Sequence, residues 1–106
     1  MSKYLFIESR DPFDTTDTHQ AFGLATALSK EGNDVTLYLV QNGVLAARAA
    51  ANALKEVGPK VSVLADDYSI EERGIEANEL AKSVRVSDVD SLVDLLCEKG
   101  TKAIWH

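Results

Sequence analysis

The stretch LSKEGNDVTLYLV, residues 28–40, contains a complete transition from helix to buried strand. Gly32 follows a segment of helical composition, and a glycine just past a helix end adopts the left-handed conformation that closes it. From Val35 to Val40 the side chains are apolar or β-favouring at nearly every position, on both faces of the strand that they predict. Strands of this kind occur in parallel sheets that are covered on two sides. The stretch therefore predicts one helix–strand step of an α/β sandwich.

The same order of residues returns twice along the chain. LKEVGPKVSVL (54–64) and LCEKGTKAIW (96–105) each end a polar-patterned segment with a glycine and then restart as an apolar run. A lysine in the last turn before the glycine suits the negative end of a helix dipole. Gly58 and Gly100 are therefore predicted to end helices, as Gly32 does.

These boundaries place the remaining elements. Strands are predicted at 3–8, 34–40, 60–64 and 102–105, with a weaker one at 82–86. Helices are predicted at Thr15–Glu31, 44–57, 69–73 and 88–99. Alternating strands and helices predict a three-layer α/β sandwich with a five-stranded, mainly parallel sheet, in which the first two strands are neighbours. No linker or low-complexity tract divides the chain, so residues 1–106 are expected to form a single domain.

Apolar periodicity indicates which face of each helix packs on the sheet. In the first helix Asp14 is the expected N-cap, and the predicted sheet-facing side chains are Ala21, Leu24, Ala25 and Leu28, with Phe22 at the edge of this face. The second helix contains LAARAAANAL, whose alanines favour helix and allow close approach of a neighbouring element or subunit. The last helix carries a predicted apolar stripe of Val89, Leu92, Val93 and Leu96.

Composition and charge exclude several classes of function. The 106 residues are 45% hydrophobic and carry a formal net charge of −6. An acidic surface repels phosphate backbones, and no cluster of Lys or Arg offsets it, so nucleic-acid binding is not expected. The apolar run at 4–7 is too short for a signal peptide or a membrane span, and one cysteine allows no intrachain disulfide. We expect a cytoplasmic protein without a membrane partner.

Polar residues follow each of the first three predicted strands. In open parallel sheets, ligands bind outside the carboxyl ends of the strands. The loops at 8–13, 41–43 and 66–69 should therefore meet at one edge of the sheet. The candidate ligand-binding residues in and beside these loops are Arg10, Gln41, Asn42, Gly43, Asp66, Asp67, Tyr68 and Arg73.

Helix capping is a competing explanation for several of these residues. Asn42 can cap the second helix, or the helix start can offer free N–H groups to an anion or a carbonyl oxygen. Ser69 and Glu72 have the spacing of a capping box. Capping gives no role to Tyr68 or to Arg73.

The two carboxylates before this short helix have an electrostatic explanation. Asp66 and Asp67 would favour the positive end of the helix, and Arg73 can reach back to either of them. A catalytic pair of carboxylates is not expected here, because adjacent residues of an extended segment point in opposite directions.

No metal or cofactor motif is present in the sequence. There is neither a GxGxxG nor a GxxxxGK[ST] pattern, so a dinucleotide or nucleoside triphosphate is not indicated. The acidic stretch RDPFDTTD (10–17) lacks the spacing of a calcium-binding EF-hand loop. His19 and His106 are isolated in the sequence and do not indicate a metal site. We therefore expect no metal and no cofactor.

Cys97 is the only thiol in the chain. Reactive cysteines usually lie at helix N-termini or beside cationic groups. Cys97 instead lies near a predicted helix C-terminus and next to Glu98, and both features disfavour the thiolate. The pattern predicts a half-buried packing residue.

Four stretches together resemble the DsrE/DsrF-like family of small sulfur-relay proteins. They are KYLFIESRDPF (3–13), VTLYLVQNGVLAAR (35–48), VLADDYSIEERGI (63–75) and KAIWH (102–106), and they cover nearly the whole chain. The resemblance implies a flavodoxin-like α/β fold, a cytoplasmic location and assembly as a trimer or hexamer, sometimes with paralogous subunits. It also implies that active members carry a persulfide on one cysteine shortly before an Arg-Gly pair, here Arg73-Gly74.

The chain departs from this pattern at the carrier itself. Residues 61–75 contain no cysteine, and the carrier position falls near Asp66, or at the latest at Ile70. A carboxylate cannot hold a sulfane sulfur. The resemblance therefore implies a subunit that binds, scaffolds or regulates in intracellular sulfur transfer or oxidation, and independent catalytic activity is not expected. Two alternatives stay open: an enzyme or sensor that binds a small ligand at the strand ends, and sulfur transfer through Cys97.

Overall fold

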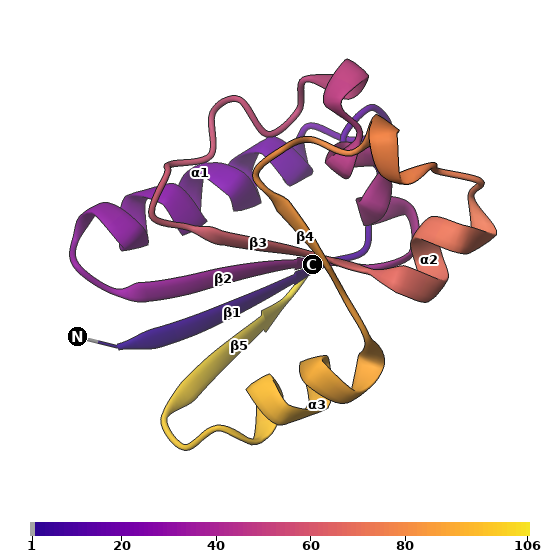
Figure 1. Ribbon diagram of the computed structural model, residues 1–106. Helices are drawn as coiled ribbons and strands as arrows, with labels where there is room; N and C mark the ends of the chain where they lie inside the picture. Colours follow the sequence, from indigo (N-terminus) through magenta and orange to yellow (C-terminus); the bar gives the residue numbers. More distant parts are fainter. Residues whose placement is uncertain (1) are drawn as a thin grey trace.

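The computed structural model describes residues 2–106, which form a five-stranded sheet with helices on both faces (Figure 1). The strands are β1 (Lys3–Glu8), β2 (Asp34–Leu39), β3 (Ser62–Asp66), β4 (Val84–Ser87) and β5 (Thr101–Trp105). Every pairing is parallel, and the spatial order is β4-β3-β2-β1-β5. The predicted parallel sheet, with its first two strands as neighbours, is confirmed.

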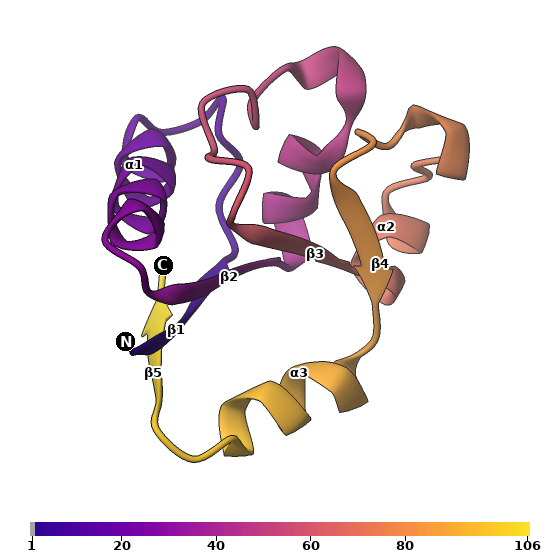
Figure 2. The ribbon, with the colours of Figure 1, turned by 60° about the vertical axis from the view of Figure 1, so that its left-hand side comes forward.

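Helical segments connect these strands on both sides of the sheet. They are α1 (Asp17–Lys30), the 3-10 helices η1 (Gln41–Ala47) and η2 (Ala49–Ala51), α2 (Asp67–Glu72), η3 (Ala77–Glu79) and α3 (Val89–Cys97). Helix α1 and the segment after β2 cover one face, and α3 covers the other (Figure 2). The fold is therefore the three-layer, flavodoxin-like α/β sandwich that the sequence predicted.

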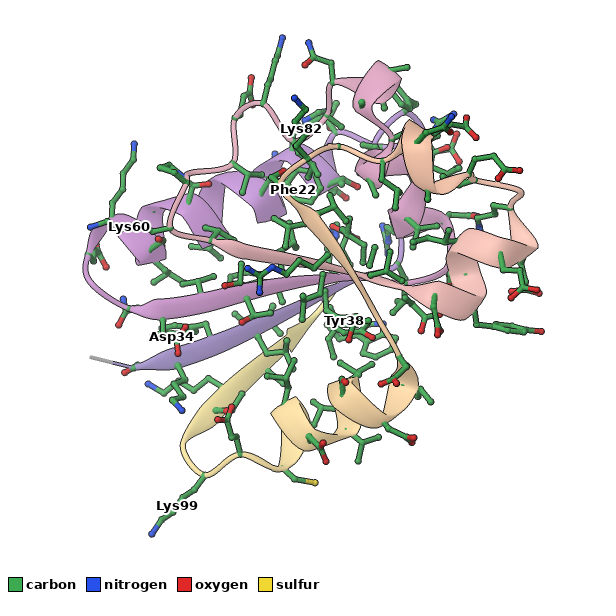
Figure 3. The ribbon with its side chains drawn as sticks, in the orientation of Figure 1. Phe22, Asp34, Tyr38, Lys60, Lys82 and Lys99 are labelled. Carbon is green, nitrogen blue, oxygen red and sulfur yellow. The ribbon has the colours of Figure 1, made fainter. Side chains whose placement is uncertain are left out.

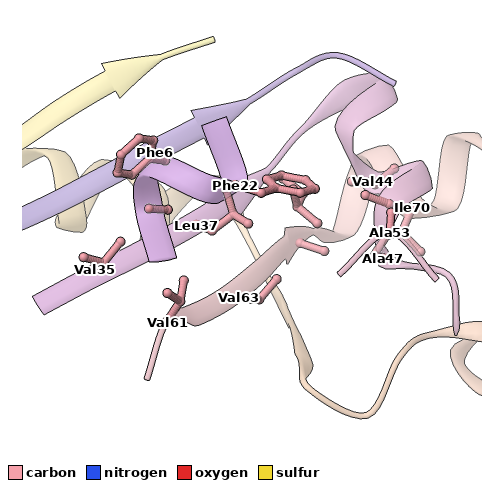
Figure 4. Packing of buried hydrophobic residues seen from close by; sticks show 14 of the residues in the cluster. Phe6, Phe22, Val35, Leu37, Val44, Ala47, Ala53, Val61, Val63 and Ile70 are labelled. Carbon is pink, nitrogen blue, oxygen red and sulfur yellow. The ribbon is translucent and has the colours of Figure 1, made fainter. Parts of the chain in front are cut away.

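The two layers of helix create two cores of different size. The larger core lies where α1 and η1 meet the sheet, and it includes Phe6, Phe22, Leu37, Val44 and Val63 (Figure 4). The smaller core, under α3, consists of Leu5, Ile7, Tyr38 and Val40, with Leu92 and Leu95 packed against it. Because successive strand residues point to opposite faces, covering both faces requires runs that are apolar throughout.

One of the three predicted glycine stops is confirmed. Gly32 directly follows Glu31, the C-cap of α1, and its φ of 91° is the left-handed conformation that closes a helix. Gly100 also has a positive φ of 86°, but α3 ends earlier, at an extended C-cap on Glu98, so Gly100 lies in the turn that leads into β5. Gly58 ends no helix, because no helix precedes it. Its N–H instead donates to Thr26 Oγ1 of α1 over 3.2 Å.

The predicted α-helix over 44–57 is wrong. After η1 the backbone is extended at Arg48, and Asn52 adopts the left-handed conformation with φ 53°. Arg48 forms an isolated antiparallel bridge with Leu80, and the Ala81 N–H donates to the Ala47 carbonyl over 2.8 Å. These tertiary contacts prevail over the helix propensity of alanine, which is worth only about 0.5 kcal/mol per residue against ordinary residues.

Helix α1 forms as predicted but starts later, and only part of its predicted face is buried: Ala25 is buried and Leu28 packs against the core. It begins at Asp17, and the Asp14 N–H closes a turn onto the Asp11 carbonyl instead of Asp14 capping the helix. The residues buried are Thr18, Phe22, Ala25, Thr26 and Ser29, whereas Leu24 is exposed. The helix is rotated toward Phe22 because the larger ring contributes more apolar area to the core. The Thr26 hydroxyl can be buried because it donates to the Phe22 carbonyl over 2.9 Å.

Helix α3 buries only part of its predicted apolar stripe. Leu92 packs on the smaller core together with Leu95, which the predicted stripe did not include. Val89, Val93 and Leu96 are exposed. The outer side of α3 therefore presents an apolar surface that no described residue covers.

Candidate functional site

A groove of about 600 Å³ lies at the carboxyl edge of the sheet, between α2 and the start of α3. Its apolar side chains are Val40, Tyr68, Val89, Leu92 and Trp105, and its carboxylates are Asp66, Asp67, Glu72 and Asp88; we call this site the edge groove. Gln41 and Ser69 complete its lining. The groove forms because β2, β3 and β5 end at the same edge, so residues far apart in the chain meet there.

Two of the three loops that were expected to converge contribute to this groove. Gln41 comes from the loop after β2, and Asp66, Asp67 and Tyr68 come from the segment after β3. The loop after β1 contributes no lining residue to it. The convergence predicted from the sequence is therefore present for the second and third strands.

A hydrogen-bond network around Ser69 fixes the α2 side of the groove. The Ser69 N–H and hydroxyl both donate to Asp66 Oδ2, over 3.0 and 2.7 Å. The Gln41 N–H donates to Ser69 Oγ over 2.9 Å. Asp66 is thus the N-cap of α2, and the predicted capping box of Ser69 with Glu72 is wrong. Ser69 is buried inside the first turn and joins the end of β2 to α2.

Arg73 does not reach back to Asp66 or Asp67 as expected. Its Nε and Nη2 atoms donate to Asn42 Oδ1 over 3.2 and 3.1 Å, and Nη1 donates to the Ser69 carbonyl over 3.2 Å. Asn42 consequently does not cap η1, whose N-cap position is held by Val40 without a side-chain bond. The two residues clamp α2 onto η1 beside the groove.

Gly43 has a steric role that the sequence did not reveal. A Cβ built at this position would overlap the Glu8 carbonyl oxygen and lie 2.9 Å from the carbonyl carbon. The Gly43 N–H donates to the Val40 carbonyl over 2.8 Å, so it is not free for an anion. The glycine allows η1 to contact the end of β1 directly.

Arg10 lies apart from the other candidate residues. Its guanidinium is exposed, with Nη1 3.9 Å from Asp17 Oδ2 at the start of α1. Its backbone N–H donates to Glu8 Oε2 over 3.1 Å. The structure therefore joins Arg10 to α1 and to β1, and not to the edge groove.

A buried carboxylate–imidazole pair was missed from the sequence. Glu8 is only 1% exposed, and His106 Nδ1 lies 2.7 and 2.9 Å from its two carboxylate oxygens. The His106 N–H also donates to the Ile7 carbonyl, and the Ser9 N–H and hydroxyl donate to the His106 carbonyl. The pair fastens the end of β5 to the end of β1. The available signal was Glu8 itself, a charged residue that ends an otherwise apolar strand.

Two titratable groups connect the groove to the core. The Tyr38 hydroxyl donates to the Asp88 carbonyl over 2.7 Å, and Figure 3 shows Tyr38 between the sheet and α3. Burial raises the pKa of Tyr38, so the phenol remains a neutral donor. The Ser91 N–H donates to Asp88 Oδ1 over 2.8 Å and lowers the pKa of Asp88. Asp88 is therefore a charged cap of α3 at the rim of the groove.

Few further reactive or metal-binding groups are found among the residues that the structure describes. Cys97 is exposed at the last residue of α3, so the expectation of a half-buried thiol is wrong. Within residues 2–106, no three His, Cys, Asp or Glu side chains gather as a set of metal ligands. No helix in the same range is long and apolar enough to cross a membrane. The serine hydroxyl of the groove, on Ser69, is engaged by Asp66 and by the Gln41 N–H, so the arrangement there is suited to binding.

Comparisons with known proteins agree with this architecture. Among solved structures, the ychN protein from E. coli is 19% identical, with a TM-score of 0.78 over 98% of this chain and 100% of that chain. A protein of unknown function, MTH1491 from Methanobacterium thermoautotrophicum, is 17% identical, with a TM-score of 0.79 over all of both chains. These likenesses show the fold, and no curated protein sequence matches the chain. The model of the DsrE/DsrF-like family matches residues 2–105, and the chain therefore belongs to the DsrE/DsrF-like family.

Proposed function

We propose that this chain is a cytoplasmic DsrE/DsrF-like subunit without the carrier cysteine, and that it binds, scaffolds or regulates in intracellular sulfur transfer or oxidation. The observation that carries the proposal is the make-up of the edge groove. Its α2 side, where the family resemblance puts the carrier, begins with Asp66 as a hydrogen-bonded N-cap and contains no thiol.

The electrostatics of the groove also oppose sulfur carriage. A persulfide forms from a thiolate, and nearby carboxylates disfavour that charged form. Four carboxylates line the groove. Cys97 lies at the opposite end of α3 from Val89, about 12 Å away along the helix at a rise of about 1.5 Å per residue. The thiol and the groove are therefore separate features of the molecule.

The apolar part of the groove supports a binding role. Tyr68 and Trp105 are 65% and 66% exposed, although each is a large ring beside other apolar side chains. Aromatic side chains are enriched in protein–protein interfaces and dominate their binding energy. We take the edge groove as the contact surface for a partner of this subunit.

Two neighbouring substitutions on α2 separate stability from binding. Ser69→Ala should cost about 1–2 kcal/mol of unfolding free energy, because Asp66 and the Gln41 N–H lose a buried partner. Tyr68→Ala should change stability by less than about 0.5 kcal/mol, because the ring is exposed. It should weaken binding to a cysteine-bearing DsrE/DsrF-like protein from the same organism.

Thermal melts and calorimetric titration of both variants measure the two effects. If Tyr68→Ala unfolds the protein while partner binding survives, the ring belongs to the core and the proposed contact surface is wrong.

We further propose that the chain self-associates, as a trimer or a hexamer, and that paralogous subunits are candidate partners. Strand β5 lies at the edge of the sheet, and none of the described strands pairs with its outer side. Open edges and apolar patches of this kind are commonly covered by partners. The apolar residues Val93 and Leu96 of α3 are also exposed. The alanine-rich segment gives no support, because it forms no α-helix.

Sedimentation equilibrium at micromolar concentration tests this prediction. We expect a species several times the monomer mass of 11.5 kDa, which Val93→Ser with Leu96→Ser should shift toward monomer. Leu24→Ser is the matched control, because Leu24 is an exposed leucine on α1. A wild-type sample that contains only the 11.5 kDa species would contradict the proposal.

A further inference from the structure

We infer that the edge groove binds a segment of a partner protein in which Lys or Arg stands next to a large apolar side chain. The inference rests on the proposed function and deepens it by stating the chemistry of the partner. It follows from two properties of the groove that a ligand has to match together. The apolar side chains of its lining form what we call the floor, and the four carboxylates form what we call the rim.

The apolar floor calls for an apolar occupant. Trp105 from the end of β5 and Tyr68 from α2 stand beside Val89, which is 60% exposed at the first position of α3. Contiguous apolar surface rimmed by polar groups marks binding sites on soluble proteins. A purely ionic ligand would leave this surface in water.

The rim selects the charge of the occupant. Asp66, Asp67 and Glu72 line the α2 side and Asp88 lines the α3 side, whereas no Lys, Arg or His lines the groove. Asp66 and Asp88 are fixed in place by their capping hydrogen bonds. Arg73, which directly follows α2, donates to Asn42 and the Ser69 carbonyl, and its Nη1 also lies 3.7 Å from Glu72 Oε1. Glu72 therefore has a counter-charge already, but burial of Asp66, Asp67 and Asp88 under a neutral or anionic partner would leave these three carboxylates without one, which is costly.

A cationic and apolar segment satisfies both parts. A Lys or Arg side chain can pair with the rim carboxylates, and its stem or a neighbouring apolar side chain can cover the floor. The exposed faces of Trp105 and Tyr68 add a cation–π contribution. Carboxylates on both sides of the floor favour an extended segment over a single small ion.

A second copy of the chain fits this groove poorly. Each copy carries 17 acidic and 11 basic residues, so a second copy brings net negative charge to an acidic rim. Nucleic acid and anionic lipid are disfavoured by the same repulsion. The exposed stripe of Val93 and Leu96, which lies outside the groove, remains available for self-association.

The fluorescence emission of Trp105 reports binding, because Trp105 is the only tryptophan in the sequence and it lines the groove. The probe is a tryptophan-free peptide, acetyl-Lys-Leu-Arg-Phe-Lys-Leu-amide, titrated into the protein at one fixed protein concentration. We expect a saturable blue shift of the emission and an affinity that falls as salt rises. One control peptide carries Glu in place of every Lys and Arg, and a second carries Ser in place of every Leu and Phe. Both should bind at least tenfold more weakly.

Protein variants assign the binding to the rim. Asp67→Asn with Glu72→Gln should weaken the basic apolar peptide about tenfold, because two exposed carboxylates of the groove become neutral. Asp90→Asn with Asp94→Asn is the charge-matched control on α3, outside the groove, and should bind as the wild type does. Far-UV circular dichroism verifies that both double variants are folded.

Several results would overturn the inference. Equal binding of the acidic peptide would show that only apolar contact matters, and equal binding of the serine peptide would show that only charge matters. Emission that is already blue-shifted and unmoved by any peptide would show that a second copy fills the groove. None of these results depends on whether Cys97 takes up sulfur, so a failure here is distinguishable from a failure of the carrier-less function.

Discussion

Gly43→Ala should destabilise the protein by about 3 kcal/mol, at the upper end of the usual cost of overpacking. The added Cβ would overlap the Glu8 carbonyl oxygen and lie 2.9 Å from the carbonyl carbon. A flexible side chain could move away, but here the obstacle is the backbone of β1 at a buried position. To relieve the overlap, η1 must separate from the end of β1, and this loosens the wall next to the edge groove.

Urea and thermal denaturation measure this effect, and the melting temperature should fall by about 15 °C. Gly23→Ala is the matched control, because it lies within α1 with nothing within 4 Å of a built Cβ. Alanine is the better helix former, so that variant should gain about 1 kcal/mol. If the two variants have equal stability, the close approach of η1 to β1 is wrong.

His106→Ala should also cost about 3 kcal/mol, as expected when a buried carboxyl group loses its main hydrogen-bond partner. Glu8 is 1% exposed, and without the imidazole its carboxylate keeps only the Arg10 N–H as a partner. The loss should not be larger, because the His106 side chain is 27% exposed and water can partly replace it.

A double substitution tests whether the loss of stability in His106→Ala comes from the Glu8 carboxylate that is left without its partner. Glu8→Met with His106→Leu replaces the pair by apolar side chains of similar volume, and it should be closer to the wild type than His106→Ala alone. Lys3→Ala is the control, because it breaks the exposed Lys3–Glu98 pair, whose worth is below about 1 kcal/mol. If the double variant is the least stable of the three, the Glu8–His106 hydrogen bond itself stabilises the fold and our explanation is wrong.

The parts of the fold that could be predicted depend on local chemistry. Gly32 ends α1 because glycine adopts the left-handed conformation without the steric cost that a Cβ brings, and this preference is local. The strands could be located because both faces of β1 and β2 must be apolar. The segment 44–57 could not be predicted, because its shape is decided by Gly43 against Glu8 and by Arg48 beside Leu80. Those contacts join positions that no local pattern relates.

The same distinction applies to the candidate site. Gln41, Asp66, Asp67 and Tyr68 could be brought together from the sequence, because parallel strands place their carboxyl ends at one edge. Arg10 follows β1 in the same way, but its side chain extends toward α1.

The pairing of Glu8 with His106 could not be predicted, because the two residues are 98 positions apart and meet only when β5 joins β1. Trp105 enters the groove for the same reason, since it ends β5.

The single thiol of the chain is exposed, so its capacity to take up sulfur can be measured directly. Cys97 is solvent-accessible at the C-terminal end of α3, so a persulfide donor can reach it. Glu98 follows it directly in the sequence, and this carboxylate pairs with Lys3 over 3.1 Å. Reactive thiols instead have a cation or a helix N-terminus beside them.

The most direct measurement is the intact mass and peptide map of the wild-type protein after incubation with a persulfide donor. Cys97→Ser is the blank, and a cysteine-bearing DsrE/DsrF-like protein from the same organism is the positive control. The positive control should gain one sulfur per chain rapidly, while Cys97 should stay unmodified on the same timescale. Rapid, stoichiometric persulfide on Cys97 would contradict the claim that this chain binds partners without carrying sulfur.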